Sequence, residues 1–252
     1  MKAARPTTLA LASLAAVSAL TVTTASATTP EPVPGVPAAT AGSSPSVALS
    51  SGVPATDFNP VTAPSRPSAQ VDTLVAYSFG TRIEEGDDPD RGIVSPGPVN
   101  EELAASVVRA LDGRDIPVSA QFEIAEVLTT RYGLEGVHVI NPVKNPDGTV
   151  TYLSTDGVAA QVASEMGAAV STATVGVIAF QDHLWRSTYT SRVNGLHAFA
   201  LSDVEMPSEY DQLSGQEWTR SPEAYLPRDY AGRAALLARV NQENIRTVLG
   251  IW

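Results

Sequence analysis

One histidine and one arginine lie three residues apart, just after a long apolar segment. The apolar segment is TVGVIAF, residues 174–180, and the next residues, QDHLWR, contain His183 and Arg186. An imidazole titrates near neutral pH, so it can act as an acid, a base or a ligand. An arginine one helical turn later shares its helix face and binds phosphate or carboxylate groups well. The pair predicts a site for a small anion, with His183 as the acid–base or anchoring group.

Polar residues also follow the other apolar segments of the chain. Because ligands of open α/β sheets bind at the carboxyl ends of the strands, these residues are candidates for contact with a ligand. Glu123 is the candidate catalytic carboxylate, which would orient His183 or act as a base. The candidates for substrate binding are Gly80, Arg82, Gln121, Ser154, Thr155, Asp156 and Arg186.

His183, Arg186 and Arg82 also have structural interpretations that need no ligand. His183 can cap its own helix, while Arg186 pairs with Asp182 or with Glu123. Arg82 can form a surface salt bridge instead of binding an anion. Both interpretations stay open at the level of the sequence.

Two hydroxyl residues and two further histidines can likewise have a functional or a structural role. Ser154 and Thr155 can contact a ligand, cap the following helix through their side-chain oxygens, or do both. A nucleophilic role for Ser154 beside a histidine would make the protein a secreted serine hydrolase. His138 and His197 lie on predicted strands and are interpreted as structural.

The composition excludes several classes of protein. The 252 residues include 27 acidic and 16 basic side chains, with a net charge of −11 and no cysteine. Nucleic-acid binding requires a basic field, so we expect no such partner. Without cysteine there is no disulfide, thiolate metal site or cysteine nucleophile. The motifs of α/β-hydrolases, zincins, P-loop NTPases and dinucleotide oxidoreductases are also absent, and no cofactor is identified.

An acidic stretch follows the first apolar segment. It contains Glu84, Glu85, Asp87, Asp88 and Asp90, and clustered carboxylates are the ligands that calcium prefers. The spacing differs from that of an EF-hand loop, so a solvated loop is the favoured interpretation and no metal site is predicted.

The elements that must position these residues alternate between apolar strands and amphipathic helices. Strands are predicted at 71–80, 116–121, 137–143, 174–180 and 197–202. Helices are predicted at 100–113 with Asn100 as N-cap, 122–133, 158–171, 183–195 and 234–252, with an irregular segment over 203–235. Fully apolar strands between helices indicate a parallel sheet covered on both faces. The predicted fold is α/β, a Rossmann-like, doubly wound and mainly parallel sheet.

The first 70 residues have a different character. Residues 1–27 have a basic start, an apolar stretch and an Ala-Ser-Ala cleavage pattern, which predicts a signal peptide cleaved after Ala27. Residues 28–70 are rich in Pro, Ala, Ser and Thr, which predicts a disordered linker. Residues 71–252 then form one domain. We expect a secreted or extracytoplasmic protein with no transmembrane segment after cleavage.

Four segments, taken in order, resemble the YdcF-like family of envelope proteins. They are LVAYSFGTR, IPVSAQFEIAEVL, YLSTDGVAAQ and VGVIAFQDHLWRSTYTSRVNGLHAF, together covering about residues 75–200. The chain departs from the family where Ala120 and Gln121 replace a Gly-Gly turn and where Asp156 and Gly157 replace an Asn. The resemblance implies a Rossmann-like fold and work in the envelope, close to the cell wall.

Two functions of different classes therefore remain, with the serine hydrolase as a weaker third. The first is an exported protein that binds or transforms a small anionic, envelope-related molecule at the carboxyl edge of the sheet. The second is a non-catalytic secreted module for binding or scaffolding.

Overall fold

The computed structural model describes residues 58–249, and their side chains as far as residue 242. The predicted signal peptide and the first part of the predicted linker, residues 28–57, lie outside the described residues. Within the described part, no helix is both long and apolar enough to cross a membrane.

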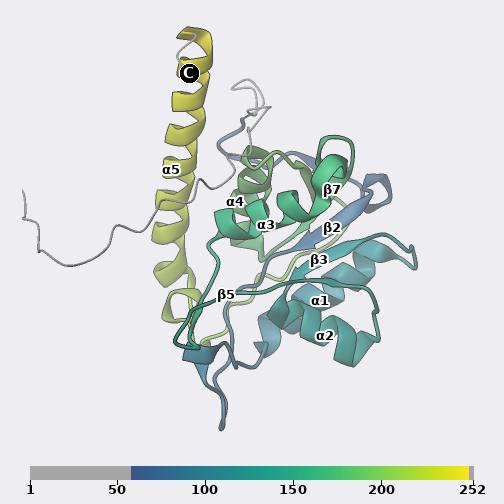
Figure 1. Ribbon diagram of the computed structural model, residues 1–252, viewed down its shortest axis with the longest axis vertical. Coiled ribbons are helices and arrows are strands. Elements are labelled where there is room, and N and C mark those ends of the chain that lie inside the picture. Colours follow the sequence, from purple (N-terminus) through teal and green to yellow (C-terminus); the bar gives the residue numbers. More distant parts are fainter. Residues whose placement is uncertain (1–57, 250–252) are drawn as a thin grey trace, which may run out of the picture. The chain divides into compact units, whose positions relative to one another are not determined.

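A six-stranded sheet forms the centre of the fold (Figure 1). The strands are β1 (Ser65–Arg66), β2 (Thr73–Ala76), β3 (Val118–Gln121), β4 (His138–Ile140), β7 (Thr174–Ile178) and β8 (His197–Leu201). Their order is β1-β8-β7-β2-β3-β4, and every neighbouring pair is parallel. The chain proceeds outward from β2 through β3 to β4, then returns to β7 on the other side of β2. This reversal is the switch point where ligands of such sheets bind, and the predicted α/β, Rossmann-like fold is confirmed.

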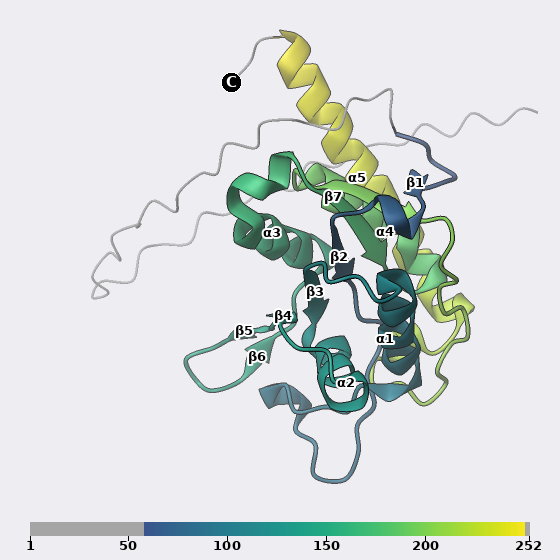
Figure 2. The same cartoon turned by 90° about the vertical axis from the view of Figure 1, so that its right-hand side faces the viewer.

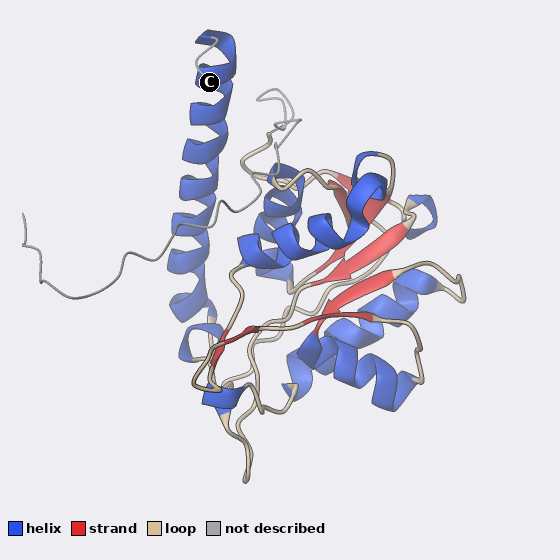
Figure 3. Cartoon of the chain, in the orientation of Figure 1, coloured by secondary structure: helices blue, strands red, loops and turns tan. Residues whose placement is uncertain are grey.

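Helices cover both faces of the sheet (Figures 2 and 3). They are α1 (Gly97–Leu111), α2 (Phe122–Tyr132), α3 (Thr155–Met166), α4 (Gln181–Val193) and α5 (Pro222–Leu249). Alternate residues of a strand point to opposite faces. Leu74 and Ala76 of β2 therefore pack in one core cluster with α1 and α2, while Val75 packs in a second cluster with α3. Helix α5 packs against α4 rather than on the sheet itself.

Asn100 is not the N-cap of α1, as the sequence predicted. The helix begins at Gly97, and Pro98 occupies its first turn, where the fixed φ of proline suits a helix start. Asn100 is fully buried and bonds the backbone after β2: it accepts from the Phe79 N–H at 2.9 Å and donates to the Gly80 carbonyl at 2.7 Å. A side chain interpreted as a cap instead fixes the loop that leads to the site.

Helix α5 begins twelve residues before the predicted start at residue 234, so the predicted irregular segment over 203–235 ends near residue 221. Pro227 lies inside the helix, and a proline inside a helix removes a hydrogen bond and usually marks an end. This single residue concealed the first turns of α5 in the sequence.

The packed part of the chain also begins before the predicted boundary at residue 71. Strand β1 pairs with β8, although its residues belong to the predicted linker. Phe58 packs on Trp185 and Tyr189 of α4, with ring centroids 5.2 and 4.2 Å apart, and Trp185 Nε1 donates to the Asn59 carbonyl. Residues 58–70 are therefore ordered by contacts that their Pro- and Ser-rich composition does not reveal.

A two-stranded antiparallel ribbon, β5 (Val143–Lys144) and β6 (Val150–Thr151), connects β4 to α3. The predicted turn at residues 145–148 joins the two strands, with the Gly148 N–H donating to the Asn145 carbonyl. The ribbon leads directly into residues 152–155, which reach the site described next.

Candidate functional site

A cavity of about 280 Å3 lies beside the carboxyl ends of β2 and β3. The first turns of α3, α4 and α5 and the loop before α5 complete its wall. The residues that line it are Tyr77, Ser78, Phe79, Gly80, Gln121, Tyr152, Leu153, Ser154, Thr155, His183, Arg186, Gln216, Trp218, Thr219 and Tyr225. The cavity therefore lies at the edge of the sheet where the sequence predicts the site.

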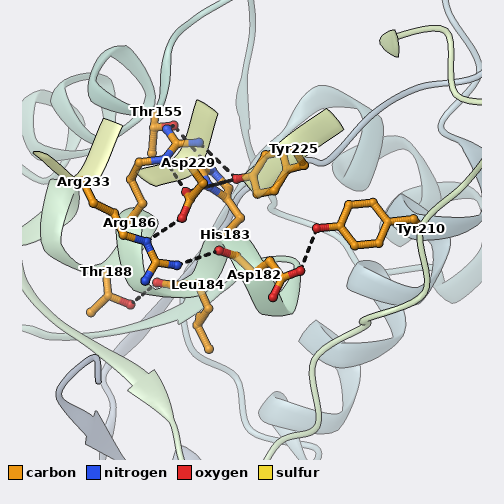
Figure 4. Close-up of polar contacts among 10 residues, drawn as sticks. All are labelled: Thr155, Asp182, His183, Leu184, Arg186, Thr188, Tyr210, Tyr225, Asp229 and Arg233. Carbon is orange, nitrogen blue, oxygen red and sulfur yellow. Dashed lines mark hydrogen bonds and ion pairs between the residues drawn. The ribbon is translucent and has the colours of Figure 1, made fainter. Parts of the chain in front are cut away.

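His183 lies in the first turn of α4 with its side chain 7% exposed. Its Nδ1 is 2.7 Å from the Tyr225 hydroxyl, and its Nε2 is 3.4 Å from Thr155 Oγ1 (Figure 4). Burial lowers the pKa of His183 to about 4, and the positive charge of Arg186 acts in the same direction. The imidazole is thus neutral at neutral pH, and it binds other side chains instead of capping its helix.

Arg186 lies one turn later on α4 and joins three elements (Figure 4). It donates to Asp229 Oδ1 at 2.7 Å, to Thr155 Oγ1 at 2.7 Å and to the Tyr225 hydroxyl at 3.0 Å. A guanidinium has five N–H donors, so two have no partner among the described residues. Neither of the ion pairs open at the level of the sequence is formed, because the partner of Arg186 is Asp229.

Asp229, on α5, is fully buried between Arg186 and Arg233. Burial raises the pKa of a carboxyl group, but the nearby His183, the hydrogen bond from Arg186 and the charges of both arginines outweigh burial and lower the pKa of Asp229 to about 2. Two arginines around one carboxylate leave a net positive charge at this end of the cavity.

Glu123 is placed differently from the role that the sequence predicts. It lies in the first turn of α2, 1% exposed, and neither carboxyl oxygen has a hydrogen-bond partner among the described residues. Burial raises the pKa of Glu123 to about 7. The hydroxyl of Tyr152 is also buried with no hydrogen-bond partner among the described residues. Burial raises the pKa of Tyr152, and the charge of Glu123 acts in the same direction. Tyr225, rather than Glu123, is the residue that orients His183.

Four of the predicted binding residues line the cavity as expected: Gly80, Gln121, Ser154 and Thr155. Gln121 Oε1 accepts from the Ser78 N–H at 3.0 Å, which leaves its amide N–H groups for a ligand. Ser154 Oγ accepts from the Gly157 N–H at 3.1 Å, so this serine caps α3 and lines the cavity at the same time.

Arg82 and Asp156 do not line the cavity. Arg82 forms a two-point salt bridge with Asp211, the alternative that the sequence left open for it. Asp156 accepts from Asn194 at 2.9 Å and from Arg239 at 2.8 Å. Both side chains bind partners that are distant in the sequence, so local spacing does not predict these contacts.

Backbone N–H groups of the acidic loop bond one of its own carboxylates. Asp87 Oδ2 accepts from the Glu84 and Ser95 backbone N–H groups. Over the described residues, no group of three or more His, Asp or Glu side chains is arranged to hold a metal ion.

Three residues of the site escaped sequence reasoning: Tyr225, Asp229 and Arg233. They are spaced four residues apart, so they share one face of α5, and that spacing is a signal in the sequence. Pro227 hides this signal, because a proline inside the segment favours an irregular structure over a helix.

Comparisons with known proteins find no matching family model, curated protein or solved structure. The resemblance to the YdcF-like family therefore stays a prediction. The function has to be argued from the geometry of the cavity itself.

Proposed function

We propose that this chain is an exported, YdcF-like protein that binds a small anionic, envelope-related molecule in the cavity beside β2 and β3. The anionic group would lie against Thr155, His183 and Arg186. One observation carries this proposal: Arg186 is the single charged side chain among the lining residues of the cavity, in a chain whose net charge is −11.

The arrangement of charges favours one negative charge on the ligand. Arg186 and Arg233 share Asp229, which leaves one net positive charge, and His183 contributes none while it is neutral. A carboxylate or a phosphodiester fits this balance better than a doubly charged phosphate monoester.

Donors are available for such a group. Arg186 retains two unpartnered N–H groups, as described above. At the start of α3, the side chain and the carbonyl of Ser154 accept hydrogen bonds from the Gly157 and Val158 N–H groups. The N–H groups of Thr155 and Asp156 have no partner among the described residues. The positive end of the helix dipole adds to the attraction.

The direct experiment is a titration of the protein with acetate, followed by calorimetry and by the Tm. We expect acetate to bind the native chain and raise its Tm, and Arg186→Gln to abolish both effects. Arg131→Gln is the matched control, because Arg131 forms an exposed salt bridge with Glu101 away from the cavity. Equal acetate binding by native protein and Arg186→Gln would remove the basis of the proposal.

Binding alone and binding followed by a reaction use the same cavity. A non-catalytic binding or scaffold module would hold the anion unchanged, whereas an enzyme would release a product. Export is tested separately: the secreted protein should begin at Thr28 when its N-terminus is measured by mass spectrometry.

A further inference from the structure

The hydroxyl of Thr155 lies between the two residues most able to activate it. Thr155 Oγ1 is 3.4 Å from His183 Nε2 and accepts a hydrogen bond from Arg186 at 2.7 Å. Thr155 is also the first residue of α3 and lines the cavity. A base, a cation and a helix N-terminus therefore converge on one hydroxyl.

The hydrogen bonds of Tyr225 are compatible with a tautomer of His183 in which Nε2 is free. The Tyr225 hydroxyl donates to Asp229 Oδ1 at 3.4 Å and accepts from Arg186 at 3.0 Å. Its third contact, at 2.7 Å, is with His183 Nδ1, and it is satisfied when Nδ1 carries the proton. In that tautomer Nε2 has a lone pair directed to the Thr155 hydroxyl.

The resulting chain runs from Thr155 through His183 and Tyr225 to Asp229 (Figure 4). A nucleophile in reach of a base, with a third group that orients the base, is the general arrangement of covalent catalysis, and its contacts are often long before substrate binds. The distance of 3.9 Å between His183 Nδ1 and Asp229 Oδ1 shows that the tyrosine bridges the two.

We infer that Thr155 is the nucleophile of an esterase that acts on small carboxylic esters. This inference rests on the proposed function, because the anion site is then the place where the ester carbonyl oxygen becomes negative and where the carboxylate product leaves. The uncharged remainder of the cavity, which includes Phe79 and Trp218, accommodates the rest of the ester.

In the first step, Thr155 Oγ1 attacks the carbonyl carbon and its proton passes to His183 Nε2. The oxyanion is stabilised by the N–H groups at the start of α3 and by Arg186. The tetrahedral centre then collapses, and the alcohol departs with the proton from His183, leaving acyl-Thr155. Water attacks this ester and gives a proton to His183, which returns it to Thr155 as the acid is released.

The neighbouring serine does not have this environment. Ser154 Oγ is bonded to the Gly157 N–H at 3.1 Å, and it makes no contact with His183. The serine hydrolase that the sequence left open is thereby replaced by a threonine one residue later. Because Ser154 caps the helix that carries Thr155 and lines the cavity, the control for a lost hydroxyl has to come from outside the cavity.

The test is reaction of the full chain with p-nitrophenyl acetate, followed by intact mass and peptide mapping. We expect an initial burst of p-nitrophenol and one acetyl group on Thr155. Thr155→Ala should reduce the burst rate by about 100-fold or more, whereas Thr155→Ser, which keeps the hydroxyl, should retain it. Thr130→Ala, which removes an exposed hydroxyl of α2 away from the cavity, should retain it as well. His183→Gln should reduce acylation as well, with the acetyl group still on Thr155 in the fraction that reacts.

The outcome is decided separately from that of the proposed function. Acetylation of Ser154 or Lys144 instead of Thr155, or no burst above that of Thr155→Ala, overturns the esterase. Acetate binding to Thr155→Ala and to the native chain, measured by calorimetry, then shows whether the anion site itself survives. The Tm of each variant excludes unfolding as the cause of a lost burst.

Discussion

The two ends of the cavity treat buried polar groups in opposite ways. At the end formed by His183, Arg186 and Asp229, every charged side chain has a partner from another helix or from its own. At the other end, the hydroxyl of Tyr152 on the cavity wall is buried with no hydrogen-bond partner among the described residues. The same holds for the carboxyl oxygens of Glu123, which lies behind the cavity lining and does not itself line the cavity. The first group of side chains has its charges paired, while the second contains buried polar atoms whose hydrogen bonds with water are not replaced.

This difference should appear in the pH dependence of stability. The pKa of His183 is lowered from 6.5 to about 4, so its neutral form contributes stability that is lost as pH falls through that range. The pKa of Glu123 is raised from 4.5 to about 7, so its contribution is lost as pH rises. The two effects oppose each other, and the native protein should show a flatter profile than a variant of either residue.

The largest effect is expected from Asp229→Ala. Removing this buried carboxylate leaves the charges of the half-buried Arg186 and Arg233 without their shared partner, and the free energy of unfolding should fall by about 3–5 kcal/mol. Urea unfolding measures the loss. Glu101→Ala is the control, because its salt bridge with Arg131 is largely exposed and should be worth about 0–1 kcal/mol. Equal losses in the two variants would contradict the importance of the buried cluster.

The next effect concerns the pH dependence of stability that the buried carboxyl group of Glu123 causes. Glu123→Gln removes the titration but keeps the shape, so its stability relative to the native protein should increase between pH 4 and pH 8 by about 3 kcal/mol, at 1.36 kcal/mol per pKa unit. Unfolding curves across that range provide the measurement. Glu126→Gln, on the exposed side of the same helix, should show no such trend. A constant difference for Glu123→Gln would mean that this carboxyl group titrates normally.

A smaller effect on stability is expected at Gly80, on the wall of the cavity. Gly80 has a φ of +72°, and an added Cβ would lie 2.6 Å from Ser214 Oγ and 2.8 Å from Thr219 Oγ1. Gly133 has a φ of +63° with open space around it. Thermal unfolding should therefore show a loss of about 1 kcal/mol for Gly133→Ala, from the backbone alone, and a larger loss for Gly80→Ala. Losses of the same size would show that the loop at 214–219 does not press on Gly80.

The sequence predicted the sheet and part of the site for clear physical reasons. Apolar strands between helices require a covered parallel sheet, and the rule for carboxyl ends placed His183 and Arg186 beside Thr155. Glu123 lies outside the cavity lining, because an acid in the first turn of a helix can face the core as well as the cavity, and periodicity does not distinguish the two.

The partners of the site residues could not be predicted from local spacing. Asp229 meets Arg186 only because α5 packs against α4, where Gly232 allows close approach: an added Cβ there would lie 2.9 Å from Arg186 Cδ. Asp211, on a loop more than a hundred residues later, likewise forms its salt bridge with Arg82 only in the folded chain. Contacts of this kind depend on the assembled fold.

The central claim is that Thr155, His183 and Arg186 form an anion site around a neutral imidazole. The most direct measurement is a proton–nitrogen NMR titration of the imidazoles, with and without acetate. We predict that His183 titrates near pH 4 and that acetate raises its pKa, because a bound anion favours the protonated ring, while acetate leaves the signals of His138 and His197 unchanged. A His183 that titrates near 6.5, or whose titration is indifferent to acetate, would contradict the claim.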